Sequence, residues 1–180
     1  MEEETRQLPE VEIYVESSYK SPAKKCGVTM YLIQMKKDGK PYKDGMAEIN
    51  VFTGTTMQQA ELRTMVKALD RFNKPCCVSF RMSDSCTAAL VNRGYPKIWE
   101  KNGWQGSSGQ IKNKADWEDL VVDMARHIHK GDLIKTGPHP KEAWMKEEIE
   151  KKIDEIEAPE NDLWLRSKNR PFWVKGERNV

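Results

Sequence analysis

The stretch TTMQQAELRTMVKALDRF, from Thr55 to Phe72, has the pattern of an amphipathic helix. Thr56 can accept hydrogen bonds from the free amides of the first turn, and Gln59 can reach back to the Thr56 amide, as in a capping box. The apolar residues that follow recur at helical spacing and predict one buried face: Leu62, Met65, Val66, Leu69 and Phe72.

Glu61 comes one residue before this apolar stripe begins, so its carboxylate is expected beside the buried face. A carboxylate in that place is costly to desolvate unless it is paired or bound to a cation. The structural alternative is a glutamate that extends along the protein surface to water. The segments on either side of the helix decide between the two.

Three strands are expected ahead of this helix. VEIYV, at residues 11–15, alternates apolar and polar side chains as a half-buried strand does. GVTMYLIQM at residues 27–35 and MAEINVF at residues 46–52 are the second and third. Asp38-Gly39 lies between these two and is a hairpin signal, so they should be antiparallel; a second Asp-Gly pair follows at Asp44-Gly45.

A fourth strand should follow the helix. Pro75 stops the helix, and CCVSFRM at residues 76–82 then alternates Val78, Phe80 and Met82. Because a helix separates this segment from the earlier strands, it has the crossover that a parallel pairing with the first strand requires.

The remainder of the chain predicts further helices and one strand. A short helix is expected through Ala88 to Gly94, and a short strand at Leu133-Ile134. Between them, a helix over residues 115–128 should bury a stripe of Trp117, Leu120, Val121, Met124 and Ile128. A last helix should begin at Pro140, bury Met145, Ile149, Ile153 and Ile156, and expose the pairs Glu147/Lys151 and Glu148/Lys152. This order of elements indicates an α/β domain with a mixed sheet.

A chain of 180 residues fits one domain with extensions, which we place at residues 1–10 (a flexible arm), 11–157 (the domain) and 158–180 (a tail in which Trp164, Phe172 and Trp173 could anchor). No apolar run approaches the length of a membrane span, and the acidic start MEEETRQ does not resemble a signal peptide. We therefore expect a cytoplasmic, monomeric protein without a membrane partner. The four cysteines form no CxxC pair, so a zinc site or a disulfide framework is not expected.

Three acidic residues are expected to meet at one edge of the sheet. Glu16 follows the first strand and Asp84 follows the fourth, and open α/β sheets place their sites outside the carboxyl ends of such strands. Glu61 projects from the start of the helix that packs on this sheet. Three carboxylates together repel one another unless a cation lies among them, and their hard oxygen atoms suit Mg²⁺ or Mn²⁺. The alternatives are that Glu16 is a loop acid and that Asp84 or Ser85 caps the next helix.

The segment YPKIWEKNGWQGSSGQIKNK, at residues 95–114, interleaves aromatic and basic side chains. Lysines such as Lys101 and Lys112 can neutralise phosphates, and the flat rings of Trp99 and Trp104 can stack on sugars or bases. The alternative is that both tryptophans anchor a solvated loop to the core. For Trp117, which heads a helical stripe, a core position is favoured.

Several of these motifs resemble the ribonuclease H family of type 1. VEIYVESS resembles the family's first strand, which ends in Asp-Gly-Ser; TTMQQAEL resembles its TTNNxMEL helix start; and MSDS resembles its TDS. The order and spacing through Trp104, Lys112-Asn113 and Trp117 also agree, so the resemblance covers residues 11–128. It implies a mixed five-stranded sheet in the order 3-2-1-4-5 flanked by helices, and a metal-dependent cut of the RNA strand of RNA–DNA hybrids that leaves a 3′-hydroxyl and a 5′-phosphate.

The resemblance also implies roles for particular residues. Glu16, Glu61 and Asp84 would hold the cation, Mg²⁺ or Mn²⁺. Gln58 matches a family asparagine that contacts the hybrid in its minor groove, and Asn113 matches another polar contact to nucleic acid. The family's basic protrusion corresponds to residues 95–114, which include Trp99, Lys101, Trp104 and Lys112.

Departures from the family pattern keep further possibilities open. Glu16 and Ser17 stand where the family has aspartate and glycine, the fourth acid is matched best by Glu147 with Glu142 as the alternative, and His139 is a weak match for the family's loop histidine. The first hypothesis is an RNA–DNA hybrid endonuclease. The second is a module of the same fold that binds nucleic acid or a protein without cutting, and a third is a nuclease that acts on DNA structures.

Overall fold

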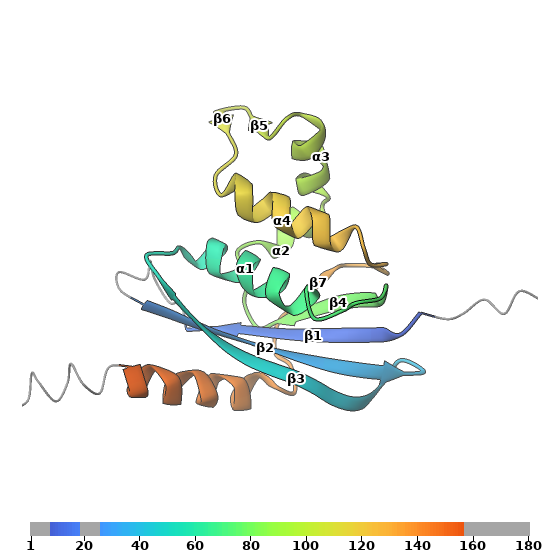
Figure 1. The fold of residues 1–180 in the computed structure, drawn as a ribbon, viewed down its shortest axis with the longest axis vertical. Coiled ribbons are helices and arrows are strands. Elements are labelled where there is room, and N and C mark those ends of the chain that lie inside the picture. The colour runs from blue at the N-terminus through green and yellow to red at the C-terminus, as the bar shows by residue number, and fades with distance from the viewer. Residues whose placement is uncertain (1–7, 19–25, 157–180) are drawn as a thin grey trace, which may run out of the picture.

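The centre of the molecule is a five-stranded mixed sheet (Figure 1). The computed structural model describes residues 8–18 and 26–156. The strands are β1 (Glu10–Ser17), β2 (Cys26–Lys37), β3 (Lys40–Thr53), β4 (Cys77–Met82) and β7 (Ile134–Thr136), in the order β3-β2-β1-β4-β7. β1 pairs antiparallel with β2 and parallel with β4, and β4 pairs parallel with β7. The predicted order 3-2-1-4-5 is confirmed, with β7 as the fifth strand.

Helices cover both faces of this sheet (Figure 1). The helices α1 (Met57–Leu69), α2 (Ala88–Asn92), α3 (Tyr95–Lys101) and α4 (Lys114–Met124) lie on one side, and a helix over residues 142–156 lies on the other. Apolar side chains of α1, α4, β1 and β4 form the larger core, and Tyr14, Val28, Met30 and Leu32 form a smaller one with Met145 and Ile149 of the last helix. The two cores fix the sheet between the helical layers.

The start of α1 has the predicted capping box. The Gln59 amide donates to Thr56 Oγ1 at 3.3 Å, and the Thr56 amide donates to Gln59 Oε1 at 3.1 Å. Leu62, Met65 and Leu69 are fully buried, so the apolar stripe faces the core as expected. The capped end of α1 carries Glu61 in its second turn.

The two Asp-Gly pairs play different parts. Asp38 and Gly39 both have positive φ, of 52° and 72°, and they form the two-residue turn between β2 and β3. Asp44-Gly45 lies inside β3, opposite a register shift in β2 between Leu32 and Gln34. A side chain at Gly45 would place its Cβ 3.1 Å from the Ile33 carbonyl oxygen, so the close approach of the strands at this irregularity explains the glycine.

Several predicted boundaries are wrong. The third strand, predicted over residues 46–52, already begins at Lys40. The helix predicted for residues 115–128 ends at Met124, and Ile128 is half-exposed instead of completing its stripe. The Ile128 backbone pairs with the start of β4, since its amide donates to the Cys76 carbonyl and its carbonyl accepts from the Val78 amide. The predicted arm of residues 1–10 reaches too far, because Glu10 already belongs to β1.

The last helix agrees with its predicted pattern. Met145 and Ile149 are buried, and Ile153 and Ile156 pack partly against the same core. Glu147 pairs with Lys151 at 3.1 Å, whereas Lys152 pairs with Glu155 and not with Glu148. In the described ranges, no helix combines the length and the apolar character needed to cross a membrane. The predicted anchors Trp164, Phe172 and Trp173 lie outside the described residues.

Candidate active site

Glu16 lies near the carboxyl end of β1 and is almost fully buried. Its Oε1 accepts from the Ser83 amide at 2.9 Å and lies 2.7 Å from His139 Nε2, and its Oε2 accepts from the Ser83 hydroxyl at 2.7 Å. Because β1 and β4 are parallel neighbours, Ser83, which follows β4, reaches Glu16 directly. The predicted meeting of the two strand ends is therefore present.

Glu61 is fully buried and faces the loop at residues 83–87 that joins β4 to α2. Its Oε2 accepts from the Thr87 hydroxyl at 2.9 Å and the Ser85 hydroxyl at 3.2 Å, and its Oε1 accepts from the Cys86 amide at 3.3 Å. Burial raises the pKa of Glu61, and the hydrogen bonds from Thr87, Cys86 and Ser85 oppose that rise. The alternative of a surface glutamate is wrong for this residue.

The Cys86 thiol adds a further donor to this carboxylate, with Sγ 3.4 Å from Glu61 Oε2. Although Cys86 is exposed as a residue, desolvation of its thiol and the charge of Glu61 raise the pKa of this thiol to about 12, so it stays protonated at neutral pH. A protonated thiol can donate to a carboxylate but is a poor nucleophile.

Asp84 stands between the two anchored segments of the loop. Ser83 is bonded to Glu16 and Ser85 to Glu61, so Asp84 lies in the loop between residues that contact the two buried acids, and its side chain is exposed. Within residues 8–18 and 26–156, no hydrogen bond reaches the Asp84 carboxylate. Of the two predicted caps, Ser85 has this role, because its Oγ accepts from the Thr87 and Ala88 amides, and Asp84 does not.

The donor atoms of this edge suit a hard divalent cation. Carboxylate and hydroxyl oxygens are the ligands that Mg²⁺ and Mn²⁺ prefer. Glu61 is a buried acid with a raised pKa and has no Lys or Arg partner among the described residues, so a cation would stabilise its charged form. In the part of the chain that the structure describes, no three His, Cys, Asp or Glu side chains are gathered closely enough to hold a metal as they stand.

The two candidates for a fourth acid differ in position. Glu142, at the start of the last helix, accepts a hydrogen bond from Lys146. The Glu142 amide also donates to the carbonyl of His139 at 3.1 Å, and the His139 ring contacts Glu16, so Glu142 follows directly on a residue of the site. The exposed Glu147 pairs with Lys151 instead. Glu142 is therefore the better placed of the two.

His139 has a larger role than its sequence position suggests. It lies in the segment between β7 and the last helix, its side chain is fully buried, and its Nε2 contacts Glu16 across 123 residues of sequence. A histidine ahead of a proline carries no local pattern that would predict this contact. Only the fold brings it to the site.

Two of the predicted nucleic-acid contacts meet each other. Asn113 Nδ2 donates to Gln58 Oε1 at 2.7 Å, joining the amino ends of α1 and α4. The Arg63–Asp116 ion pair, at 2.7 Å, fixes the same two helices one turn further on. The other atoms of the two amides have no hydrogen-bond partner within the described ranges.

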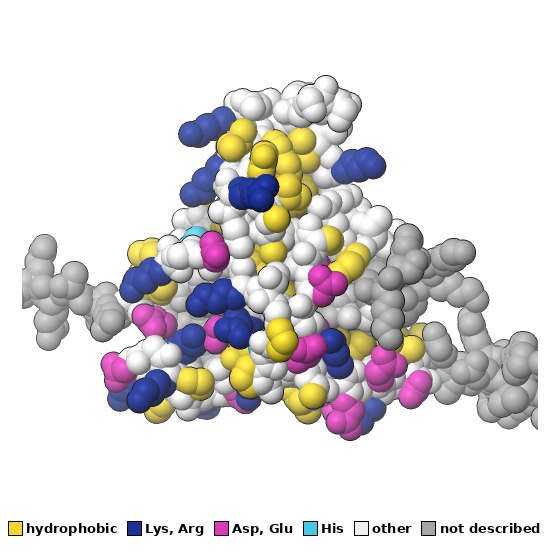
Figure 2. All heavy atoms as spheres, turned by 180° about the vertical axis from the view of Figure 1, so that it is seen from behind, with side chains coloured by type: hydrophobic (Ala, Val, Ile, Leu, Met, Phe, Trp, Pro, Cys, Tyr) yellow, Lys and Arg dark blue, Asp and Glu magenta, His cyan; other side chains and the backbone are white. Residues whose placement is uncertain are grey.

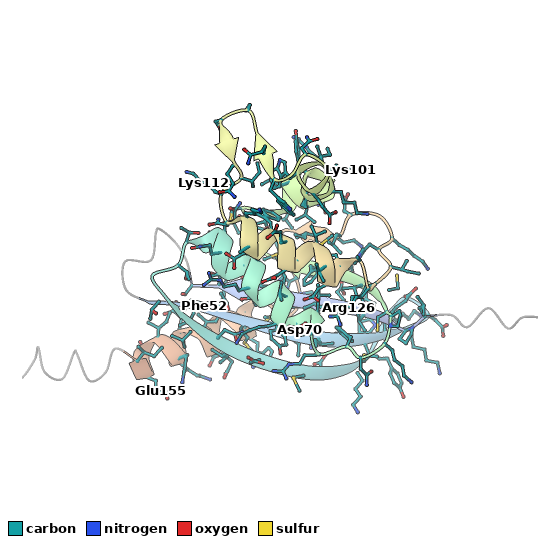
Figure 3. The ribbon with its side chains drawn as sticks, turned by 45° about the horizontal axis from the view of Figure 1, so that its top comes forward. Phe52, Asp70, Lys101, Lys112, Arg126 and Glu155 are labelled. Carbon is teal, nitrogen blue, oxygen red and sulfur yellow. The ribbon has the colours of Figure 1, made fainter. Side chains whose placement is uncertain are left out.

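The protrusion, residues 95–114, consists of α3 and the two-stranded sheet of β5 (Gln105–Gly106) and β6 (Gly109–Gln110). Lys101 and Lys112 are both exposed and lie on the upper part of the molecule (Figure 3). Seen from behind, hydrophobic side chains gather there with Lys or Arg side chains around them (Figure 2). The lysines are therefore available to phosphates, as the sequence predicts.

The tryptophans of the protrusion serve its packing. Trp104 is 6% exposed and belongs to the larger core, so its predicted role as an exposed stacking platform is wrong. Trp99 is partly buried and packs edge-to-face on Trp117 with ring centroids 5.3 Å apart, which leaves only part of it accessible. Trp117 is 1% exposed, as the core interpretation expects.

With this geometry in place, comparison with known proteins identifies the family. The family model named RNase H matches residues 8–135, well over half of the chain. The chain belongs to the RNase H family. The matched region runs from β1 to β7 and so includes Glu16, Glu61 and Asp84.

Individual relatives in the RNase H family are distant. The chain is similar to Ribonuclease HI of Haemophilus influenzae, at 31% identity over 102 residues, which covers 54% of this chain and 64% of that protein. It is also similar to Ribonuclease H of Oleidesulfovibrio alaskensis, at 29% identity over 85 residues, covering 47% of this chain and 55% of that protein. The chain thus spans less than two thirds of the length of either relative.

Solved structures of RNase H proteins share the fold. LC9-RNase H1, a type 1 RNase H with the type 2 active-site motif, aligns with a TM-score of 0.59 at 19% identity, over 78% of this chain and 70% of that one. LC11-RNase H1, solved in complex with an RNA/DNA hybrid, aligns with a TM-score of 0.54 at 13% identity, over 82% of this chain and 99% of that one. At such identities, the likeness concerns the fold alone.

Proposed function

We propose that this protein is a divalent-metal-dependent endonuclease that cleaves the RNA strand of RNA–DNA hybrids. The observation that carries the proposal is the pair of buried acids, Glu16 and Glu61, anchored on either side of Asp84 in a chain of the RNase H family. Relatives named ribonuclease H, and a structural neighbour solved with an RNA/DNA hybrid, support the same substrate class. We further propose that the protein acts as a cytoplasmic monomer.

Glu16, Glu61 and Asp84 would hold Mg²⁺ or Mn²⁺, in keeping with a family that is in general metal-dependent. When bound, such cations supply an activated water and a counter-charge for the leaving oxygen in phosphodiester hydrolysis. The protein's part is to present oxygen atoms at a fixed place, and the loop at residues 83–87 does so by hydrogen-bonding both buried acids. Glu142 would assist from the last helix, in preference to Glu147.

The remaining candidates would position the nucleic acid. Gln58 and Asn113 form one polar pair between α1 and α4, and we propose that their free amide atoms contact the hybrid. Lys101 and Lys112 would neutralise backbone phosphates, a contribution that weakens as salt rises. Only part of the Trp99 ring would reach the nucleic acid, because the residue is partly buried and packs on Trp117.

A second candidate function is a module that binds hybrids without cutting. It is favoured by the arrangement of the acids, since no three metal-binding side chains are gathered in the described part of the chain and Glu16 already has three hydrogen-bond partners.

Cleavage of a hybrid with a labelled RNA strand, in Mg²⁺ and separately in Mn²⁺, tests the proposal. The parent should cut the RNA strand and leave 3′-hydroxyl and 5′-phosphate ends, and Asp84→Asn should not. Duplex DNA and single-stranded RNA of the same sequence serve as matched substrates. If the parent binds the hybrid but cuts nothing in either metal, the endonuclease is excluded and the binding module remains.

A further inference from the structure

His139 is a buried ionisable group that the proposed reaction leaves unexplained. Its side chain has no exposed surface, and it approaches the site from the segment after β7 rather than from the strands that carry the acids. The inference below rests on the proposed cation site, because it concerns what His139 does to Glu16.

The hydrogen bonds of the imidazole fix which nitrogen carries its proton. The Lys141 amide donates to His139 Nδ1 at 3.3 Å, so the lone pair of Nδ1 is occupied. The ring proton of the neutral imidazole is therefore on Nε2, which donates to Glu16 Oε1 at 2.7 Å. Because Nε2 presents a hydrogen and not a lone pair, His139 is a donor to the acid and not a ligand for a metal.

One ring contact and a chain of side-chain hydrogen bonds connect the segment of His139 to three strands. The His139 ring packs on the Tyr14 ring with centroids 5.0 Å apart. The Tyr14 hydroxyl lies 3.1 Å from Gln34 Oε1, Gln34 Nε2 donates to Asp44 Oδ1 at 2.6 Å, and Lys141 Nζ donates to Asp44 Oδ2 at 2.7 Å. β1, β2 and β3 are thus connected through side chains to the segment that carries His139.

The same bonds limit how Glu16 can bind a cation. A carboxylate offers about four acceptor positions, and three are filled: two on Oε1, by the Ser83 amide and His139, and one on Oε2, by the Ser83 hydroxyl. One position remains, on Oε2. A glutamate has one more rotatable bond than an aspartate, and these donors remove the freedom that the extra bond adds.

We propose that His139 is a positioning residue that holds Glu16 by Oε1 and leaves one acceptor position on Oε2 available to the cation. This bond would let a glutamate serve where the resemblance implies an aspartate. Such supporting hydrogen bonds around a metal ligand typically change metal affinity about 10- to 100-fold.

Two amide substitutions at position 139 separate this role from packing. The side-chain nitrogen of glutamine reaches the place of His Nε2, whereas the shorter asparagine reaches only that of Nδ1. His139→Asn should therefore lose the bond to Glu16 and His139→Gln should keep it, although both replace a ring by a neutral amide. The readout is the dissociation constant of Mn²⁺ from the full chain, measured by electron paramagnetic resonance of free Mn²⁺.

The expected result is an Mn²⁺ affinity about 10- to 100-fold weaker in His139→Asn and within a few-fold of the parent in His139→Gln. Hybrid cleavage should need correspondingly more metal in His139→Asn and recover at saturating Mn²⁺. Equal Mn²⁺ affinity in all three proteins would overturn the inference, as would equal losses in both variants, which indicate packing alone. A parent that binds no Mn²⁺ overturns it too. A parent that binds Mn²⁺ with the expected variant pattern but does not cut hybrids supports the inference and refutes only the proposed activity.

Discussion

Replacing Glu61 by glutamine is expected to separate the stability of the protein from its function. The Glu61 carboxylate is fully buried, accepts bonds from Thr87, Ser85 and Cys86, and faces no Lys or Arg among the described residues. Burial raises its pKa in the folded protein, so the unfolded chain loses this proton at a lower pH than the native protein does. The free energy of unfolding therefore falls as the pH rises from the pKa of Glu61 in the unfolded chain to its pKa in the folded protein. The glutamine of the variant cannot ionise, so the variant should not lose stability in this way.

In the absence of a divalent cation at neutral pH, Glu61→Gln should be at least as stable as the parent. Addition of Mg²⁺ or Mn²⁺ at 100 times its dissociation constant should stabilise the parent by about 2.7 kcal/mol. For a domain of this size that corresponds to a rise in melting temperature of roughly 5–10 °C. The variant should lose most of this rise, and its cleavage rate should fall at least about 100-fold, because metal stabilisation of the transition state is worth several kcal/mol.

The assay is thermal unfolding with and without metal, together with hybrid cleavage. Glu155→Gln is the matched control, since Glu155 is an exposed acid of the last helix that pairs with Lys152 at 3.2 Å and lies on the other side of the sheet from α1 (Figure 3). The reasoning would be refuted by a Glu61→Gln protein that gains as much stability from metal as the parent does and still cuts. A variant much less stable than the parent without metal would refute the claim that this buried charge is costly.

Three other predictions follow from separate parts of the molecule. Trp104→Ala should lower the free energy of unfolding by about 3–5 kcal/mol in urea titrations, because the ring is in the core. Trp104→Phe should fold and bind the hybrid as the parent does. A large loss of hybrid affinity in a stable Trp104→Phe protein would contradict the core role of Trp104. In an Asp84→Asn background, which prevents cutting, Lys101→Ala and Lys112→Ala should each reduce the slope of log K against log [salt] by up to about 0.9, whereas Lys151→Ala on the opposite layer should not. Burial lowers the pKa of His127, whose Nδ1 accepts from the Cys76 amide. The free energy of unfolding should therefore fall as the pH drops below the unfolded pKa of about 6.5, by at most about 1.4 kcal/mol per pH unit. His127→Asn should flatten this dependence, and an unchanged slope would show that another group causes it.

The architecture could be predicted from sequence because local patterns and connectivity point the same way. The capping box at Thr56, the turn at Asp38-Gly39 and the crossover before β4 together leave few arrangements of the sheet. The predicted boundaries were wrong where a pattern has two interpretations. The third strand was predicted to begin after Asp44-Gly45, but this pair lies inside β3 and accommodates a register shift. Ile128 continues a helical spacing while its backbone pairs with a strand.

The sequence predicts which acidic residues form the site but not which contacts they make. Strand ends and a helix start indicate Glu16, Asp84 and Glu61, because topology alone brings such positions to one edge. The partners of these acids depend on a loop conformation and on a segment 123 residues away, neither of which has a periodic signal. The same limit applies to the protrusion, where an aromatic ring among lysines fits stacking and burial equally well, and packing decided for burial at Trp104.

The surroundings of Glu16 lead to an expectation opposite to the one that the resemblance suggests. Aspartate is the family's residue, so Glu16→Asp would ordinarily be expected to improve metal binding. Here the Ser83 amide, the Ser83 hydroxyl and His139 approach the carboxylate to within 2.7–2.9 Å at the end of the longer side chain. Shortening that chain by one C–C bond, about 1.5 Å, would move the oxygens beyond hydrogen-bond distance of these donors unless the backbone shifts. Glu16→Asp should therefore weaken Mn²⁺ binding and leave His139 Nε2 buried without an acceptor, which costs about 1–3 kcal/mol of stability. Tighter Mn²⁺ binding by Glu16→Asp would show that the donors around Glu16 are not matched to its length, and that His139 restrains the site instead of supporting it.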